Sequence, residues 1–527
     1  MFWADDIAER IQERFADKIA RKEPIIIRDE KTASGRVHVG SLRGVAIHGL
    51  VYEVLKEKGI AAKYLFEIND FDPMDGIPVY LDQEKYTQHL GKPLCNVPSP
   101  DGKAKNFAEY YGEEFIGVIR ELGFEPEFYR SSDTYRSGAY DAVIRIALEK
   151  ADQIREIYQR VSGSVRAPDW SPVQMICENC GKVSTTRITG FDGTLASYTC
   201  VDLEWTTGCK HSGTASPFKG GAKLPWKVEW AAKFGVMGVD VEGAGKDHST
   251  RGGSRQVAEA IAREVFGFTP PFDIPYEFFN VGGKKMSSSK GKGSSSREMA
   301  DLLPPHILRL LLLQKVPQRV IDFIPDGDTV PILYDTYDSL AKEYFLQAGS
   351  QDSRLFRLMH FPAISALLRP RFLPRFSQVA YLTQMPHIDI QTEARREKGS
   401  DLTSDDLDEI KLREKYARRW LDAYAPEDYK FDLKEDAVPA AVKSFSAEQK
   451  AALAQVLEYV KSQKTLNGQD LHTKLHEIRK ATNIDAKLFF EALYLSFLGK
   501  SSGPKAGWFF SVLDKKFVEK RLEEVIS

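Results

Sequence analysis

One histidine stands in a run of small and polar residues directly behind the first apolar segment of the chain. Residues 25–27 are a β-branched triplet, and the stretch 32–41 behind it reads TASGRVHVGS, with the histidine at His38. The triplet predicts a buried strand, and the apolar spacing over 41–58 predicts a helix. In open α/β sheets such a turn binds phosphates, although the same unit is also ordinary structure in α/β proteins.

A second candidate phosphate site is a loop rich in glycine, lysine and serine. Residues 282–291 read GGKKMSSSKG and follow a stretch over 276–279 that we expect to be a strand. Glycines allow a backbone to approach a ligand closely, and serine hydroxyls, backbone amides and ammonium groups all donate to phosphate oxygens. The loop is therefore either a solvated surface segment or a triphosphate-binding loop that faces the turn at His38.

Four of the five cysteines fall in one compact module over about 167–223. They are Cys177, Cys180, Cys200 and Cys209. The first two form a CxxC pair and the last two a wider pair, which is the composition of a tetrahedral structural zinc site, and His211 could replace Cys209 in it. The alternative is four reduced, buried thiols, which a module this small and polar could hardly enclose. Cys95 lies outside the module and is expected to be a lone thiol.

The elements that must position these residues alternate between strands and helices in the first half of the chain. We expect a second strand over 62–68 and helices over 106–122, 137–161 and 254–266. The chain from about 73 to 225 forms an insert that carries the cysteine module. Alternation of this kind indicates an α/β fold around a parallel sheet.

The chain changes character after Pro304 and Pro305, because strands become hard to find. The apolar spacing predicts helices over 306–315, 333–347, 403–424, 447–463, 471–481 and 486–497. We therefore expect an α-helical half over 346–527, joined to the first half by a connecting segment over 296–345. The charge-dense stretch 389–402 is expected to be an exposed loop or a linker between two helices.

Composition is that of a globular protein, and we expect no membrane span. Of 527 residues, 42% are hydrophobic and 28% charged, and no apolar run reaches the roughly 18 residues that a span needs. The length predicts about three or four domains. The N-terminus lacks the pattern of a signal peptide, so a cytoplasmic location is expected.

The formal net charge of −2 excludes a generally basic protein, so nucleic-acid contacts have to come from local patches.

The two candidate phosphate segments together resemble the signature motifs of class I aminoacyl-tRNA synthetases. His38-Val39-Gly40-Ser41 is similar to the HIGH motif, and Lys285-Met286-Ser287-Ser288-Ser289 is similar to the KMSKS loop. The second histidine of HIGH is replaced by Ser41, which can hydrogen-bond a phosphate but cannot supply an imidazolium. The second lysine of KMSKS is Ser288, a usual variant in this family.

Within that class, the chain resembles the class I lysyl-tRNA synthetases over nearly its whole length. The segments that carry this likeness are TASG at 32–35, WKVEW at 226–230, GKDH at 245–248, PYEF at 275–278, YAPED at 424–428, LGK at 498–500 and GP at 503–504. The resemblance implies a Rossmann-type α/β catalytic domain over 1–295 with the zinc module inserted, a stem-contact segment over 296–345, and an anticodon-binding domain of the α-helix-cage type over 346–527. The chain is expected to be a monomer.

The reaction that the resemblance implies joins lysine to ATP as lysyl-adenylate and then transfers the lysyl group to tRNA(Lys). His38 and Lys285 are the expected catalytic residues, with His38 at the α-phosphate or ribose and Lys285 closing over the leaving pyrophosphate. The expected ATP-binding residues are His38, Gly40, Ser41, Lys285, Met286, Ser287 and Ser288. Mg²⁺ is expected with the ATP, because displacement at phosphorus needs positioning and charge neutralisation more than a protein nucleophile.

The residues expected to bind the amino acid are Glu30, Thr32, Trp226, His248 and Tyr276. The resemblance places Thr32 near the α-amino group, and the position of Glu30 at a strand end makes it our candidate counter-ion for the ammonium. Trp226 and Tyr276 could also be core aromatics. Because of Arg28, a glutamate-activating enzyme remains an alternative hypothesis. Glutamyl-tRNA synthetases use an arginine at a similar strand position to bind an acidic side chain.

The stretch 354–388 contains five arginines and no acidic residue. Aromatic residues are interleaved with them, namely Phe356, Phe361, Phe372, Phe376 and Tyr381. Arginine with exposed aromatics suits RNA, but phenylalanine in a helical half is more often core, so we predict tRNA contacts only for Arg369, Arg371 and Arg375.

A third hypothesis is a paralogue that binds tRNA or a nucleotide without aminoacylating. The intact His38 and Lys285 argue against it.

Overall fold

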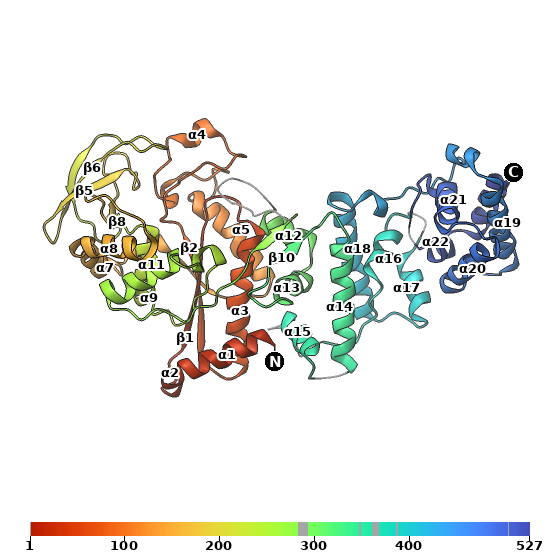
Figure 1. The fold of residues 1–527 in the computed structure, drawn as a ribbon, viewed down its shortest axis with the longest axis horizontal. Helices are drawn as coiled ribbons and strands as arrows, with labels where there is room; N and C mark the ends of the chain where they lie inside the picture. Colours follow the sequence, from red (N-terminus) through yellow and green to blue (C-terminus); the bar gives the residue numbers. More distant parts are fainter. Residues whose placement is uncertain (1, 283–293, 347–348, 361–367, 386–387, 504) are drawn as a thin grey trace. The chain divides into compact units, whose positions relative to one another are not determined.

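The structure is a computed structural model that describes residues 2–282, 294–346, 349–360, 368–385, 388–503 and 505–527 (Figure 1). The chain divides into two compact units. The first comprises Met1–Phe323 and Ser339–Leu368, and the second comprises Ile324–Asp338 and Arg369–Ser527. Within the described residues, no helix has both the length and the apolar character that crossing a membrane requires.

A parallel sheet forms the centre of the first unit. Its strands are β1 (Ile25–Thr32), β2 (Ala62–Asn69) and β3 (Glu127–Arg130), paired in the order β1-β2-β3. β1 and β2 pair in register, from Ile25 opposite Ala62 to Thr32 opposite Asn69. Single parallel bridges from Ile27 to Val241 and from Val241 to Phe272 continue the sheet beyond β1. This order is that of a Rossmann-type sheet, so the predicted fold class is confirmed.

Helices cover both faces of this sheet (Figure 1). On one side, α3 (Leu42–Glu57) connects β1 to β2 and packs beside α1 (Trp3–Arg14), while α5 (Phe107–Glu121) lies against β2. α3 is buried along most of its length, which is why its apolar residues are not confined to one stripe. On the other side, α9 (Trp226–Val236) packs against α11 (Ser254–Ile261).

Other elements of the first unit flank this core. They are α2 (Ala16–Ala20), α4 (Gln83–Thr87), α6 (Ser131–Arg136), α7 (Asp141–Glu149), α8 (Ala151–Ser162), α10 (Lys246–Ser249), α12 (Ser296–Leu302), α13 (Pro305–Leu313), α15 (Gln351–Met359), β9 (Phe279–Val281) and β10 (Ile321–Phe323). The single helix expected over 137–161 is two helices, because the backbone leaves helical geometry at Lys150 (φ −110°, ψ 28°). The strand expected over 276–279 begins later, as β9, and Tyr276 forms an isolated parallel bridge to Gly245.

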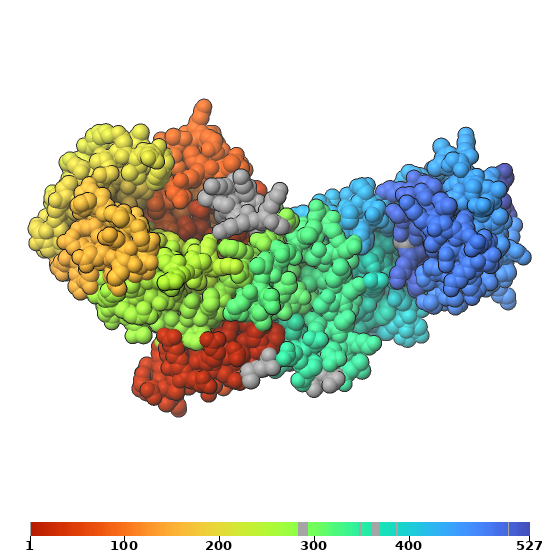
Figure 2. All heavy atoms as spheres, in the orientation of Figure 1, coloured from red at the N-terminus to blue at the C-terminus, as the bar shows by residue number. Residues whose placement is uncertain are grey.

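The cysteine module is a small antiparallel structure on the surface of the first unit (yellow in Figure 2). β5 (Thr186–Phe191), β6 (Ala196–Cys200) and β7 (Ser212–Ala215) form a three-stranded sheet in that order. β4 (Gln174–Met175) pairs antiparallel with β8 (Ala222–Lys223). This pairing brings the two ends of the module together, so the module is a closed excursion from the main path of the chain.

The second unit is helical, as predicted. α14 (Thr329–Leu346) begins in it, and its further helices are α16 (Phe376–Leu382), α17 (Ile390–Lys398), α18 (Ser404–Ala423), α19 (Ala447–Ser462), α20 (Gly468–Ala481), α21 (Ala486–Leu498), α22 (Ala506–Val512) and α23 (Lys515–Ile526). α18 and α19 each begin with a capping box, formed by Thr403 with Asp406 and by Ser446 with Gln449. Their buried faces join a core that includes Leu453, Phe489 and Phe497.

The stretch expected to be a loop or linker, 389–402, contains the helix α17. The Asp389 side chain accepts hydrogen bonds from the backbone N–H groups of the first turn, and Gly399 ends the helix in the left-handed conformation (φ 73°). The buried residues of α17 are Ile390 and Ala394. Two buried residues do not produce an apolar stripe along the helix. The capping residues Asp389 and Gly399 therefore indicate this helix, whereas its hydrophobic pattern does not.

Candidate functional site

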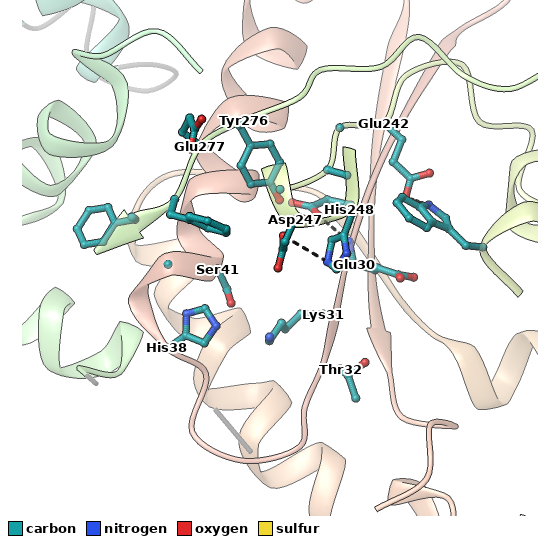
Figure 3. Close-up of a pocket in the computed structure, with 18 of the residues that line it drawn as sticks. Glu30, Lys31, Thr32, His38, Ser41, Glu242, Asp247, His248, Tyr276 and Glu277 are labelled. Atoms are coloured by element: carbon teal, nitrogen blue, oxygen red, sulfur yellow. Dashed lines mark hydrogen bonds and ion pairs between the residues drawn. The ribbon is translucent and has the colours of Figure 1, made fainter. Parts of the chain in front are cut away.

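A pocket of about 310 Å³ opens at the carboxyl end of β1 (Figure 3). Its walls come from the end of β1, the turn into α3, the start of α9, and the segments 242–248 and 276–279. Parallel bridges from Ile27 to Val241 and from Gly245 to Tyr276 hold these segments at one edge of the sheet. In sheets of this topology, that edge is the usual place for a ligand.

The pocket brings together many of the residues predicted from the sequence. They are Glu30, Thr32, His38, Gly40, Ser41, Trp226, His248 and Tyr276. The other predicted nucleotide residues, Lys285, Met286, Ser287 and Ser288, lie outside the described residues. The described chain on both sides of them is held at the pocket, because Phe279 lines it and the N–H of Val39 donates to the carbonyl of Ser294 at 3.1 Å.

The turn at His38 presents the start of a helix to the pocket. Val39–Ser41 forms a short 3₁₀ turn, and α3 follows it directly. A Cβ on Gly40 would lie 2.9 Å from Nδ1 of His38 and 3.4 Å from the carbonyl oxygen of Phe279. Glycine therefore lets the imidazole, the turn and β9 lie in direct contact. The amide groups at a helix start carry partial positive charge, which suits a phosphate.

Aromatic rings form one wall of the pocket. The indole rings of Trp226 and Trp230 stack with centroids 5.7 Å and planes 16° apart, and the imidazole of His248 lies edge-on at 5.0 Å from Trp226. Trp226 is 37% exposed and Trp230 is buried, so Trp226 lies in the pocket wall and not in the core. Burial raises the pKa of the Tyr276 hydroxyl, which therefore stays protonated and can donate a hydrogen bond.

A buried ionic cluster lies behind the pocket, with Arg28 of β1 at its centre. The guanidinium of Arg28 is fully buried and does not line the pocket. Its Nη1 donates to Glu242 at 2.7 Å and its Nε to the hydroxyl of Tyr129 at 2.8 Å. Its Nη2 donates to Glu67 at 2.9 Å and also to Glu30. Carboxylates of the protein therefore neutralise the positive charge of Arg28.

Lys233 of α9 is the second buried cation of the cluster. Its Nζ lies 2.6 Å from Glu30, 2.7 Å from Glu67 and 3.3 Å from Glu229. Burial alone would raise the pKa of Glu30, but Lys233 and Arg28 lower it well below its usual value. Glu30 is therefore ionised, and it keeps part of its side chain in the pocket.

Lys223 extends the cluster to the predicted substrate residue Thr32. Its Nζ lies 2.9 Å from both Glu229 and Asp72, and Asp72 accepts a hydrogen bond from the Thr32 hydroxyl at 2.6 Å. The cations of the cluster are Arg28, Lys223 and Lys233, and its carboxylates are Glu30, Glu67, Asp72, Glu229 and Glu242. With all groups ionised, three cations face five carboxylates, so the cluster carries an excess of negative charge.

Glu242 is a pocket carboxylate that was not predicted. Its Oε1 accepts hydrogen bonds from Arg28 at 2.7 Å and from the indole N–H of Trp230 at 3.2 Å. Its Oε2 is buried and has no hydrogen-bond partner among the described residues, and burial raises the pKa of this carboxyl. A cationic ligand would satisfy Oε2. In the sequence, Glu242 follows Val239-Asp240-Val241, and no motif there marks it as a pocket residue.

The four cysteines of the module meet at one point. The sulfur atoms of Cys177, Cys180, Cys200 and Cys209 all lie within 4.8 Å of one another. Sulfur–sulfur distances of 3.5 Å and 3.8 Å fit a tetrahedron of Zn–S bonds of about 2.3 Å, whose edges measure about 3.8 Å. The Thr185 hydroxyl, 3.1 Å from the sulfur of Cys200, gives the cluster a polar second layer. His211 is not part of this cluster, which can hold a metal ion through sulfur alone.

The predicted tRNA-contacting arginines lie in the second unit. Arg371 pairs with Glu409 at 3.3 Å, Arg375 pairs with Asp335 at 2.6 Å, and Arg369 is exposed. Of the aromatic residues interleaved with them, Phe356, Phe376 and Tyr381 are buried core residues, and Phe361 lies outside the described residues.

A cavity of about 640 Å³ also lies in the second unit. Its walls include the aromatic side chains of Tyr429, Phe431 and Trp508 and the cations Arg375 and Lys505. Nζ of Lys505 lies 5.3 Å from the ring centroid of Trp508. Aromatic walls with cations at the rim suit a planar group attached to a phosphate, such as a nucleotide.

Two family models match the chain, one for each part. The model for tRNA synthetases class I (K) matches residues 1–364, and the model for an anticodon binding domain matches residues 380–526. A solved glutamate tRNA ligase from Elizabethkingia meningosepticum aligns with 96% of this chain and 99% of its own, at 15% identity and a TM-score of 0.42.

Curated relatives match over the full length. The lysine–tRNA ligase of Methanosarcina barkeri is 34% identical over 99% of this chain and 97% of its own. That of Archaeoglobus fulgidus is 31% identical over all of both chains, and that of Methanocaldococcus jannaschii is 32% identical over 99% of each. Since a class I (K) model covers more than half of the chain and relatives above 30% identity cover nearly all of it, the chain belongs to the family of class I lysyl-tRNA synthetases.

Proposed function

We propose that the chain activates lysine with ATP to form lysyl-adenylate and transfers the lysyl group to the 3′-terminal adenosine of tRNA(Lys). The observation that carries this proposal is a single pocket that joins a phosphate-binding turn at His38 to an acidic end formed by Glu30 and Glu242. The turn suits the phosphates of ATP, and the two carboxylates suit the side-chain ammonium of lysine.

In the first step, an oxygen of the lysine carboxylate attacks the α-phosphorus of ATP, and the bond from phosphorus to the pyrophosphate oxygen breaks. His38, Ser41 and the amides at the start of α3 bind the α-phosphate, where negative charge develops. Lys285, with Met286, Ser287 and Ser288 beside it, acts on the leaving pyrophosphate, and Mg²⁺ carried by the ATP neutralises its charge. In the second step, a ribose hydroxyl of the tRNA attacks the carbonyl carbon of the adenylate, and AMP leaves.

The lysine side chain lies with its methylene groups along the rings of Trp226 and His248. Its ammonium then reaches Glu30 and the buried Oε2 of Glu242, which otherwise lacks a donor among the described residues. Thr32, whose hydroxyl is oriented by Asp72, receives the α-amino group. An ammonium in this position offsets the negative charge of the cluster, which is the physical reason for selecting a cationic amino acid.

A glutamate substrate fits this pocket poorly. Arg28, the residue that could have bound an acidic side chain, is buried, and its guanidinium already contacts Glu30, Glu67 and Glu242. A substrate carboxylate would face carboxylates of the protein, and like charges at close range are costly. A non-catalytic binding protein would not require an acidic pocket beside the phosphate-binding turn.

The cysteine cluster holds one structural Zn²⁺ in this proposal. Four sulfur ligands leave no open coordination position for water or substrate, which is typical of structural sites. The ion would tie together segments of the module that are joined at its base by β4 and β8. A module stabilised in this way bears on the acceptor end of the tRNA.

The second unit is assigned to the anticodon loop. Its cavity with aromatic walls suits an unstacked base, and Arg369, Arg371 and Arg375 suit the neighbouring phosphates. The sequence predicts catalysis in residues 1–295, the stem contact in 296–345 and anticodon binding in 346–527, of which 369–527 belong to the second unit. A cytoplasmic location and a monomeric state stay predictions from the sequence.

The proposed reaction predicts lysine-dependent exchange of labelled pyrophosphate into ATP. The purified chain is assayed with each amino acid in turn, with and without tRNA, and exchange is expected with lysine. Exchange with glutamate in its place would select a glutamate-activating enzyme. If no amino acid supports exchange, with or without tRNA, the chain is a binding protein without catalytic activity.

Glu242→Gln is expected to raise KM for lysine by about 10- to 150-fold, because a hydrogen bond to a charged group contributes roughly 1.5–3 kcal/mol. KM for ATP should change by less than about twofold, since the carboxylate is assigned to the amino acid alone. Steady-state aminoacylation kinetics measure both constants. Glu259→Gln is the matched control, because Glu259 pairs with Arg255 at 3.0 Å outside the pocket. An equal rise of both constants in Glu242→Gln would refute the assignment.

Elemental analysis of the purified chain is expected to find one zinc per molecule. Cys177→Ser should lower both the zinc content and the Tm, because a structural metal site contributes to folding. Cys95→Ser removes a cysteine outside the cluster and should leave both unchanged. A zinc content well below one in the unmodified chain, or an unchanged zinc content in Cys177→Ser, contradicts the site.

Trp508→Ala is expected to weaken binding of an anticodon stem-loop RNA by about 5- to 150-fold, the usual effect of losing one base-stacking side chain. Fluorescence anisotropy with a labelled stem-loop measures the Kd. Tyr459→Ala is the control, since Lys474 lies 5.9 Å from the ring of Tyr459 in the same unit but outside the cavity. Equal losses in the two variants, at unchanged Tm, count against the cavity as the base site.

A further inference from the structure

Lys31 lines the pocket but is not part of the buried ionic cluster. Successive side chains of a strand point to opposite faces of the sheet, so Lys31 shares a face of β1 with Asp29 and not with Glu30. The face of Asp29 is that of α3, because Asp29 lies 3.2 Å from His48 of that helix. The face of Glu30 is that of α9, where Lys233 lies at 2.6 Å.

The side chain of Lys31 extends into the pocket. Figure 3 shows its ammonium end directed towards the side of the pocket where His38 and Ser41 lie. That side contains the start of α3, whose amides already favour an anion. Lys31 therefore adds an ammonium group to this side of the pocket, which also carries Asp29, whereas the carboxylates of the ionic cluster lie on the other face of β1.

Within the described part of the chain, no carboxylate lies within ion-pair distance of the Lys31 ammonium. Burial lowers the pKa of Lys31, and the neighbouring Asp29 and Glu30 counteract this only in part. A partly buried cation without a paired anion is unfavourable, and in proteins such groups are usually paired. An anionic ligand group in the pocket would complete this pairing.

We propose that the ammonium of Lys31 binds the α-phosphate of ATP and stabilises the negative charge that develops there when the lysine carboxylate attacks. This inference rests on the proposed function, because it takes ATP as the nucleotide. Lys31 forms no covalent bond and transfers no proton in this step; it acts by electrostatic stabilisation. Ser41 at the start of α3 offers a hydroxyl and no charge, so Lys31 supplies a cation that the turn itself lacks.

The anion could in principle be the lysine carboxylate, which is also negatively charged, but the geometry favours the phosphate. Thr32 and Glu30, the residues assigned to the amino acid, lie on the face of β1 opposite Lys31. The turn at His38 lies on the same side as Lys31. A phosphate at this turn meets both, and a charge-assisted contact between them is strong because the pocket is partly shielded from water.

The test compares binding of AMP and adenosine, which differ by the α-phosphate, to the full-length chain by titration calorimetry. Lys31→Met is expected to weaken AMP binding by about tenfold and to leave adenosine binding unchanged, whereas Lys31→Arg should keep most of the AMP affinity. The same Lys31→Met variant should lower kcat of lysine-dependent pyrophosphate exchange by about 100-fold, with KM for lysine within twofold.

Lys63→Met is the matched control, because Lys63 is a lysine of the neighbouring strand β2 outside the pocket. Equal losses for AMP and adenosine in Lys31→Met would show a structural role and overturn the proposal. A loss of affinity for lysine but not for lysinol, with AMP unaffected, would assign Lys31 to the carboxylate and overturn it as well. Selective loss of AMP affinity in a chain that fails to activate lysine would support this inference while refuting the proposed function.

Discussion

The ion pairs of Arg28 and Lys233 with Glu67 and Glu30 hold the first unit together where the pocket forms. Both cations are fully buried, and through these contacts β1, β2 and α9 share one network of charges. Removing one partner from such a network leaves an unpaired buried charge, at a cost of about 3–5 kcal/mol, whereas replacing a whole ion pair by apolar residues is often neutral. Stability alone therefore does not explain the cluster. Its excess of carboxylates does, because that excess makes one side of the pocket negative.

The strand β1 separates two kinds of chemistry by its period of two residues. Arg28, Glu30 and Thr32 face the ionic cluster, and Asp29 and Lys31 face α3. In the proposed function, the ammonium of the substrate then meets the carboxylates of the cluster on one face, and a phosphate meets Lys31 on the other. The sharp turn at Gly40 supports this arrangement, since any side chain there would press on His38.

Short-range patterns in the sequence were enough to predict the first two strands of the sheet, the turn at His38 and the cysteine cluster, but not β3. Each depends on residues close together in the chain: a β-branched triplet before a helical pattern, or cysteines at metal-ligand spacing. The break at Lys150 and the helix α17 were missed because their hydrophobic patterns do not reveal them. Glu242 was missed because its importance depends on an unpaired oxygen beside a buried arginine, which only the tertiary structure reveals.

In the sequence, Arg28 alone could not distinguish a lysine-activating from a glutamate-activating enzyme. An arginine at position 28 can either point into a pocket and bind an acidic side chain, or be enclosed by carboxylates and leave the pocket acidic. The difference depends on Glu67 in β2 and on Glu242 in the segment that bridges to the other side of β1, which enclose the guanidinium. It also depends on Lys233, which pairs with Glu67. None of these residues is close to Arg28 in sequence. In the proposed function, specificity therefore depends on the charge of the whole cluster, and the sign of that charge favours an ammonium.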